Sequence, residues 1–208
     1  MTKNKGLFIT FEGIEGSGKS TQIKMLTEHL TQKGIEYLVT KEPGGTDIGY
    51  KIRQILLDKN SHFKSKYAEL LLFYADRLEN VAENIVPAIE VGKVVICDRY
   101  IDSSIAYQIG ARLMPAKLVA SLNKLVGLMP DITLLYDLDP EIGLKRASLR
   151  SEKDRFEKEE MTFHHNVRNA YLNQAKIEPS RIKIIEISDL NPEQVFSKTL
   201  EKLDIFLK

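Results

Sequence analysis

The chain has a single cysteine and no long apolar run. Cys97 cannot form an internal disulfide, and such sparing use of cysteine fits the reducing cytoplasm. No apolar run approaches the ~20 residues that a membrane-spanning helix needs. The short charged start, residues 1–5, leads directly into an apolar segment, so we expect no signal peptide.

The chain also lacks an excess of charge of either sign. Its 30 basic and 29 acidic side chains nearly cancel, so we expect neither a nucleic acid nor a membrane surface as a partner. The four histidines, His29, His62, His164 and His165, show no metal-ligand spacing. We expect the adjacent His164 and His165 to face solvent, and we assign no histidine to a site.

What the chain does contain is a glycine-rich loop at residues 13–20, with the spacing Gly-x-x-x-x-Gly-Lys-Ser. An apolar run at residues 7–11 predicts a buried strand before it. Behind it, Ile23, Leu26 and Leu30 recur at helical intervals. Strand, loop and helix in this order predict a phosphate-binding loop for a purine triphosphate with Mg²⁺. The alternative is an ordinary glycine turn with Lys19 in solvent.

The residue types of the loop suit that chemistry. Gly13, Gly16 and Gly18 allow positive φ angles, so that successive backbone N–H groups can point at phosphate oxygens. The following helix adds the positive end of its dipole. We expect Lys19 to reach the β- and γ-phosphates and the Ser20 hydroxyl to bind Mg²⁺.

The rest of the chain alternates strands and helices. Apolar runs at 35–40, 94–97, 132–138 and 182–187 predict four further strands with helical patterns between them. The first helix should end near Gly34, a helix over residues 64–91 should break at Asn80 or Pro87, and residues 103–108 should be helical. We predict one α/β domain over residues 1–208, a three-layer fold with a five-stranded parallel sheet and helices on both faces.

Polar residues follow several of these strands, at the sheet edge where ligands bind in such folds. Asp98 closes the strand at 94–97, in the usual place of an acid that organises magnesium, and Arg99 beside it suits phosphate oxygens. Phe73 and Arg77 lie four residues apart and share a helix face, either as a site or as a core residue beside a surface charge. A charge-dense stretch at 151–155 has the composition of a mobile lid, which we place at about residues 146–157.

The remaining features favour a small kinase. The chain has no Asp-x-x-Gly, and residues 123–126 read Asn-Lys-Leu-Val, without the acid of a guanine-binding motif. Arginines are spread over several elements, as two anionic substrates in one cleft would require. An acceptor that is itself a phosphate needs no general base.

Six segments together resemble bacterial thymidylate kinase, in the family's order and over nearly the whole chain. They are residues 11–21 (Phe-Glu-Gly-Ile-Glu-Gly-Ser-Gly-Lys-Ser-Thr), 42–46 (Glu-Pro-Gly-Gly-Thr), 72–77 (Leu-Phe-Tyr-Ala-Asp-Arg), 98–100 (Asp-Arg-Tyr), 103–108 (Ser-Ser-Ile-Ala-Tyr-Gln) and 154–157 (Asp-Arg-Phe-Glu). The resemblance implies transfer of the ATP γ-phosphoryl group to dTMP with Mg²⁺, for nucleotide biosynthesis, in a cytoplasmic homodimer.

The resemblance also implies roles for individual residues. Phe73 would stack on thymine, Arg77 and Gln108 would hydrogen-bond the base near Ser104, and Tyr107 would favour deoxyribose. Arg53 and Arg99 would hold the acceptor phosphate, and Glu15 would approach the acceptor and the magnesium. The implied dTMP set is Glu42, Pro43, Arg53, Phe73, Arg77, Arg99, Ser104, Tyr107 and Gln108. The ATP set is Gly13, Ile14, Glu15, Gly16, Ser17, Gly18, Lys19, Ser20, Thr21 and Arg146. The metal set is Ser20, Asp98 and Glu15.

Catalysis would fall to Lys19, Arg99, Glu15 and Arg150. Because Gly16 stands where some relatives carry a loop arginine, the chain resembles the type whose catalytic arginine lies in the lid, with Arg146 or Lys153 as alternatives to Arg150. The chain departs from the family pattern at two positions. Glu15 stands where many relatives have Asp, and Ile109 stands where glycine is usual, with Gly110 following it. Two other functions stay open at this point: another nucleoside monophosphate kinase, or a nucleotide-binding regulator without turnover.

Overall fold

In the computed structural model, five parallel strands form one sheet in the order β2-β3-β1-β4-β5. The structure describes residues 6–149 and 154–207. The strands are β1 (Leu7–Glu12), β2 (Tyr37–Lys41), β3 (Val94–Asp98), β4 (Ile132–Asp137) and β5 (Ile182–Glu186). The expected five strands and the parallel sheet are confirmed, with ends that differ by one or two residues.

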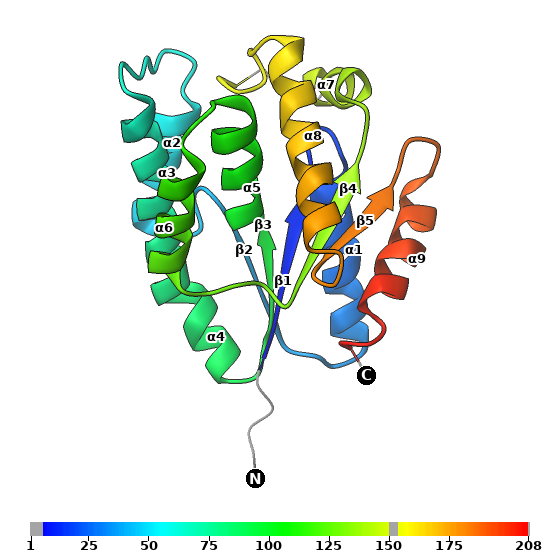
Figure 1. Ribbon diagram of the computed structural model, residues 1–208. Coiled ribbons are helices and arrows are strands. Elements are labelled where there is room, and N and C mark those ends of the chain that lie inside the picture. The colour runs from blue at the N-terminus through cyan, green and yellow to red at the C-terminus, as the bar shows by residue number, and fades with distance from the viewer. Residues whose placement is uncertain (1–5, 150–153, 208) are drawn as a thin grey trace.

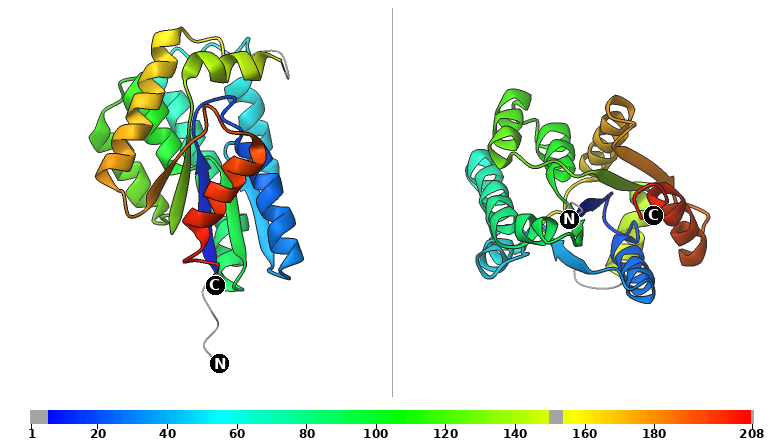
Figure 2. Two further views of the ribbon diagram at one scale, coloured as in Figure 1. Left: turned by 90° about the vertical axis from the view of Figure 1, so that its right-hand side faces the viewer. Right: turned by 90° about the horizontal axis from the view of Figure 1, so that it is seen from below.

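Helices cover both faces of the sheet. α1 and α9 lie on one face, and α3, α6 and α8 lie on the other (Figures 1 and 2). The helices are α1 (Lys19–Gln32), α2 (Asp47–Leu57), α3 (Lys66–Asn80), α4 (Val86–Glu90), α5 (Ile101–Ser104), α6 (Ala116–Val126), α7 (Pro140–Ser148), α8 (Met161–Ile177) and α9 (Pro192–Leu203). Two π-helical segments are η1 (Val81–Ile85) and η2 (Ile105–Ala111).

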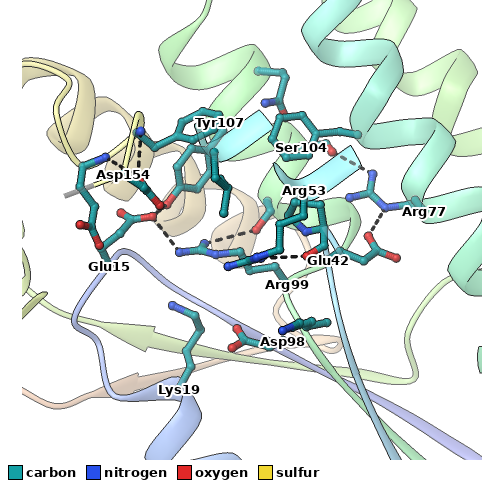
Figure 3. A pocket seen from close by; sticks show the side chains of 18 of the residues that line it. Glu15, Lys19, Glu42, Arg53, Arg77, Asp98, Arg99, Ser104, Tyr107 and Asp154 are labelled. Atoms are coloured by element: carbon teal, nitrogen blue, oxygen red, sulfur yellow. Dashed lines mark hydrogen bonds and ion pairs between the residues drawn. The ribbon is translucent and has the colours of Figure 1, made fainter. Parts of the chain in front are cut away.

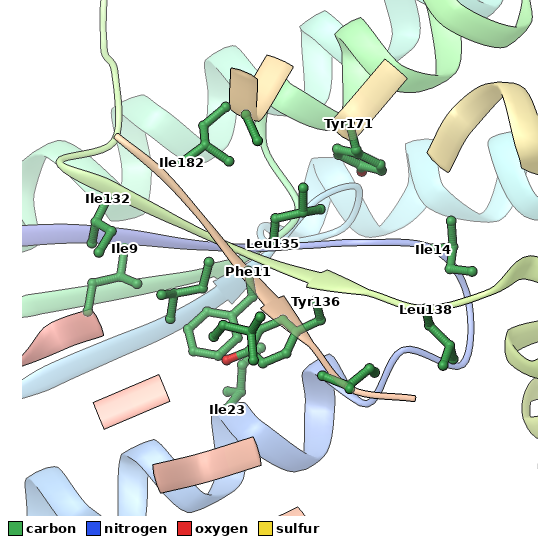
Figure 4. Close-up of a cluster of buried hydrophobic side chains, with 14 of the residues drawn as sticks. Ile9, Phe11, Ile14, Ile23, Ile132, Leu135, Tyr136, Leu138, Tyr171 and Ile182 are labelled. Carbon is green, nitrogen blue, oxygen red and sulfur yellow. The ribbon is translucent and has the colours of Figure 1, made fainter. Parts of the chain in front are cut away.

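The core follows the two-residue period of the strands. Ile9 and Phe11 of β1 pack with Leu26 of α1, whereas Phe8, which precedes Ile9, packs with Leu70 of α3 on the opposite face. Figure 4 shows Phe11 stacked on Tyr136, with ring centroids 5.5 Å apart, on the side of the sheet that faces α1. Because side chains are buried on both faces of the central strands β1, β3 and β4, these strands are mostly apolar up to their acidic last residues.

Two helical predictions need adjustment. The predicted helix over residues 64–91 ends its regular part at Asn80, as expected, and continues through η1 into α4. Residues 103–108 do not form one α-helix, because a wide π turn begins at Ile105 after the short α5. A π turn adds a residue to the loop of each hydrogen bond and is common beside functional sites.

Candidate functional site

The loop between β1 and α1 has the conformation that its glycines predict. Gly16 and Gly18 have φ angles of 72° and 82°, and α1 begins at Lys19. The Lys19 ammonium turns back and donates to the carbonyl oxygens of Gly13 and Ile14, over 3.0 Å each. Burial lowers the pKa of Lys19 to about 8, and the nearby Arg99 adds to this effect. The carboxylates of Asp98, Glu15 and Glu12 offset only part of the cost of burying this ammonium.

Gly16 is confined by the neighbouring helix. A Cβ atom at this position would collide with the backbone carbonyl of Gly143 on α7. Gly143 has the same constraint in return, because its own Cβ would meet the Glu15 carbonyl. The loop therefore has no room for a side chain at residue 16, which is consistent with the expectation that catalytic charge comes from elsewhere.

Asp98 and Arg99 extend from the end of β3 toward the loop. Asp98 Oδ1 is buried and has no hydrogen-bond partner within the described residues. Arg99 has a φ of 71°, in the region that L-residues rarely adopt, and its guanidinium donates to Glu15 Oε1 over 2.9 Å. Burial alone would raise the pKa of Glu15, but Arg99 and Lys19 together hold it below its ordinary value.

Behind Arg99 lies a buried hydrogen-bond network centred on Glu12, the last residue of β1. Glu12 Oε2 accepts from the hydroxyls of Ser103, over 2.6 Å, and Tyr171 of α8, over 2.7 Å. Both hydroxyls also lie within 3.4 Å of Arg99 Nη1. Burial raises the pKa of Glu12 to about 6. The network fixes Arg99 against the phosphate loop.

Arg77 is fully enclosed, with 2% of its surface exposed. Its guanidinium donates to Glu42 Oε2 over 2.7 Å, to Ser104 Oγ over 2.8 Å and to the Tyr100 carbonyl over 2.9 Å. The alternative that Arg77 is a surface charge is therefore wrong. Arg77 ties three elements of the cleft together, and Figure 3 shows it between Glu42 and Ser104.

The loop after β2 is held in place by Arg53 and Asp76. Arg53 Nη1 donates to the Pro43 carbonyl over 2.8 Å, and the Gly44 N–H donates to Asp76 Oδ1 over 2.7 Å. The Glu42–Pro43 peptide bond is cis. Burial raises the pKa of Asp76 to about 6. Arg53 therefore faces the cavity from α2, beside a loop that is fixed on both sides.

These side chains surround one cavity of about 330 Å³ (Figure 3). Fourteen of the predicted residues line it: Glu15, Gly16, Lys19, Ser20, Glu42, Pro43, Arg53, Phe73, Arg77, Asp98, Arg99, Ser104, Tyr107 and Gln108. The predicted residues that do not line the cavity are Gly13, Ile14, Ser17, Gly18, Thr21 and the exposed Arg146. Arg150 and Lys153 lie outside the described residues. The lid side of the cavity is formed by Asp154, Phe156 and Glu157.

The sequence patterns missed several residues of the site. Glu12 and Tyr171 were not predicted, although a carboxylate between an apolar strand and the first loop glycine was a possible signal for Glu12. The expectation that both adjacent histidines face solvent is wrong for His164, which is 1% exposed and whose Nδ1 lies 3.9 Å from Glu15 Oε2. His165 is exposed, 3.0 Å from Glu141. No sequence signal separated the two.

The comparisons with known proteins agree on one family. A family model described as thymidylate kinase matches residues 11–198. The chain is 44% identical over 209 residues to thymidylate kinase of Clostridium novyi, covering 99% of this chain and 100% of that protein. It is 47% identical to thymidylate kinase of Halothermothrix orenii, covering 96% and 97%. The crystal structure of thymidylate kinase from Ehrlichia chaffeensis superposes with a TM-score of 0.79 at 34% identity, covering 96% and 99%.

Proposed function

The chain belongs to the thymidylate kinase family, and on this premise we propose how its residues bind and join the two substrates. The enzyme phosphorylates dTMP to dTDP with the γ-phosphoryl group of ATP, a step of nucleotide biosynthesis. The comparisons do not favour the alternatives of another monophosphate kinase or a regulator without turnover. The observation that carries the proposal is the single cavity in which the phosphate loop meets Phe73, Arg77 and Gln108.

ATP binds with its phosphates in the loop of residues 13–21. The loop N–H groups and Lys19 hold the phosphate oxygens, and the ammonium exchanges its two carbonyl acceptors for phosphate oxygens. This exchange brings further negative charge to the buried ammonium of Lys19, so the ammonium contributes most when the nucleotide is bound.

The acceptor dTMP occupies the opposite side of the cavity. The ring centroids of Phe73 and Phe156 lie 5.9 Å apart, and the part of the Phe73 ring that lines the cavity stacks on the base. Gln108 reads the base edge, and Arg77 contributes donors beyond the bonds that anchor it. Arg53 and Arg99 hold the acceptor phosphate between the loop after β2 and the phosphate loop. Tyr107, whose hydroxyl donates to Glu15 over 2.6 Å, borders the sugar.

The acceptor oxygen of dTMP is already an anion and needs no general base. The enzyme therefore accelerates the reaction by positioning the two substrates and by stabilising the charge of the transferring phosphoryl group. Arg99 spans both substrates because its pairing with Glu15 fixes it beside Lys19. Arg150, with Arg146 or Lys153 as alternatives, supplies further positive charge from the lid. Charge that arrives only when the lid closes limits transfer of the phosphoryl group to water.

Mg²⁺ is the proposed cofactor, with Ser20 and Asp98 as its protein ligands and Glu15 near them. The residues present fit this ion, because Asp98 Oδ1 is a buried oxygen in need of a partner and Ser20 lines the same cavity. No group of three or more potential metal ligands occurs in the part of the chain that the structure describes. Mg²⁺ commonly takes one or two protein ligands plus substrate phosphates and water, and when bound it neutralises the β- and γ-phosphates.

We propose that two copies associate through the layer formed by α2 and α3. Ile48 and Ile55 of α2 and Tyr67 and Leu71 of α3 are large apolar side chains between 47% and 54% exposed. Covering them in a homodimer would remove that area from water. No helix in residues 6–149 or 154–207 is long and apolar enough to cross a membrane. The chain's one cysteine fits a cytoplasmic location.

A coupled assay of ADP release tests the residue roles. With dTMP, dUMP, dCMP, AMP and GMP as acceptors, we expect dTMP to give the highest kcat/KM. For Arg150→Ala we expect a collapse of kcat with nucleotide affinities largely retained, because this charge acts in the transition state. Unchanged kcat would move the role to Arg146 or Lys153. Asp98→Asn should raise the Mg²⁺ concentration needed for half-maximal activity.

A further inference from the structure

A second cavity, of about 450 Å³, lies outside the cleft described above. It is formed by the connection between α2 and α3, by the first turn of α3 and by residues 155–159, which precede α8. Arg155 joins these walls, since its Nε donates to the Leu56 carbonyl over 2.9 Å and its guanidinium lies 5.0 Å from the Phe63 ring centroid.

The lining of this second cavity is strongly positive. Five cationic side chains line it, against two carboxylates, so three positive charges remain in excess. The carboxylates are already paired with the lining arginines: Glu69 accepts from Arg155 over 2.6 Å, and Glu159 accepts from Arg112 over 2.6 Å. The five cations are Lys59, Lys66, Arg112, Arg155 and Lys158.

Lys66 and Lys158 add positive charge that is not paired with either lining carboxylate, and one arginine donor remains unused. Arg155 Nη2 is buried and has no hydrogen-bond partner within the described residues. A buried donor of this kind costs free energy unless something accepts from it. An anion with several oxygens, held by lysines and by the fixed fork of an arginine, would meet this need.

The wall between the two cavities is shared. Along residues 154–159, Asp154, Phe156 and Glu157 line the dTMP side, whereas Arg155, Lys158 and Glu159 line the second cavity. α3 is shared in the same way, since Glu69 faces the second cavity and Phe73, one turn later, lines the first. An occupant of one cavity therefore contacts the segments that shape the other.

We propose that this second cavity is a binding site for a polyphosphate anion, and that its occupation changes the affinity of the cleft for dTMP. Binding of the anion to the second cavity does not depend on the residue roles proposed above. Its effect on dTMP affinity rests on the proposed function, in which dTMP occupies the first cavity. The anion changes the affinity for dTMP by the same factor as dTMP changes the affinity for the anion, because coupling between two sites is reciprocal.

Inorganic tripolyphosphate is the probe, measured by calorimetry on the full chain. The enzyme is first saturated with dTMP and a non-hydrolysable ATP analogue, so that the phosphate loop is occupied. The test variant combines Lys66→Ala with Lys158→Ala. The matched control combines Lys64→Ala with Lys176→Ala, two exposed lysines that do not line either cavity.

We expect one equivalent of tripolyphosphate to bind the natural chain and the control variant, and to bind the test variant at least about tenfold more weakly. Absence of binding, or equal affinity for both variants, would overturn the site. The dTMP affinity is then measured with and without tripolyphosphate, and we expect a change of about fivefold or more in the natural chain only. An unchanged dTMP affinity would refute the coupling. Tighter binding of dTTP than of tripolyphosphate would extend the site to a nucleotide, and equal binding would restrict it to the phosphate chain.

Discussion

Tyr171 of α8 donates its hydroxyl to Glu12 at the end of β1 over 2.7 Å, joining two residues 159 positions apart. The same hydroxyl accepts from Arg99 over 3.2 Å and lies 2.7 Å from Ser103 Oγ. A residue of α8 thus holds Arg99, the arginine that we propose contacts both substrates. Tyr171 itself does not line the cavity, so it acts as a positioning residue through Arg99.

Tyr171→Phe should lower kcat by about tenfold while leaving the fold intact. The variant keeps the buried ring but removes the hydroxyl, so Arg99 loses one of its two neutral partners and Glu12 Oε2 keeps the Ser103 hydroxyl as its one remaining side-chain donor within the described residues. Steady-state kinetics with dTMP and ATP measure this loss. Tyr136→Phe is the control, since it removes a buried hydroxyl bonded only to Thr199, away from the cleft. Equal effects of the two substitutions would reduce Tyr171 to a structural role.

Phe73→Leu should weaken dTMP binding by about tenfold and leave ATP binding unchanged. The substitution retains an apolar side chain in the cavity but removes the ring that would stack on the base, a contact worth about 1–3 kcal/mol per base. Phe73→Tyr keeps the ring and is the matched control. Calorimetric titration of dTMP into each protein makes the comparison, and an unaltered affinity of the leucine variant would reject stacking.

Local patterns predicted the parts of this molecule that local residues determine. The phosphate loop, the five strands and the polar strand ends follow from glycine spacing and apolar runs within a few residues. The burial of Arg77 could not be predicted in this way, because its partners Glu42, Ser104 and Tyr100 come from distant segments. The helix face shared by Phe73 and Arg77 was visible in the sequence, but what that face packs against was not.

The same limit explains the two histidines and the π turn. His164 and His165 are adjacent, yet one is buried beside Glu15 and the other is exposed, because successive residues of α8 point to different neighbours. The π turn at Ile105–Ala111 arises where η2 packs closely along α8. Both outcomes depend on tertiary contacts that helical periodicity does not encode.

The depressed pKa of Lys19 predicts a measurable pH dependence of stability. The folded chain loses this proton near pH 8, whereas the unfolded chain keeps it up to its ordinary pKa of 10.5. Between these values the unfolded state binds more protons, so the free energy of unfolding of the natural chain rises with pH relative to Lys19→Met. Urea unfolding at pH 7, 8, 9 and 10 measures the difference between the two proteins.

The control for this experiment is Lys24→Met, which removes an exposed lysine from the same helix. Lys19→Met should also lower kcat by at least about a hundredfold, because it removes a donor to the transferring phosphates. A difference in unfolding free energy between the natural chain and Lys19→Met that stays constant from pH 7 to 10 would contradict the burial of a charged Lys19.

Gly110→Ala should disturb the dTMP side of the cleft from outside it. A Cβ at residue 110 would lie 2.5 Å from Ala170 Cβ and 3.3 Å from the Asn166 carbonyl, both on α8. Gly110 therefore lies in close contact with α8, while Ile109 packs with the apolar cluster on the α3 side of the sheet. Overpacking of this kind costs about 1–3 kcal/mol of stability, and a shift of η2 would move Tyr107 and Gln108.

A compensating substitution separates this contact from a general effect on the helix. Ala170→Gly removes the atom that the new methyl group meets, at a cost of about 1 kcal/mol in a helix interior. We expect Gly110→Ala to raise the KM for dTMP more than the KM for ATP, and the double variant to recover most of the lost affinity. Thermal unfolding and steady-state kinetics on all four proteins complete the double-mutant cycle. If the two substitutions are simply additive, the close approach of η2 to α8 does not control the dTMP side of the cavity.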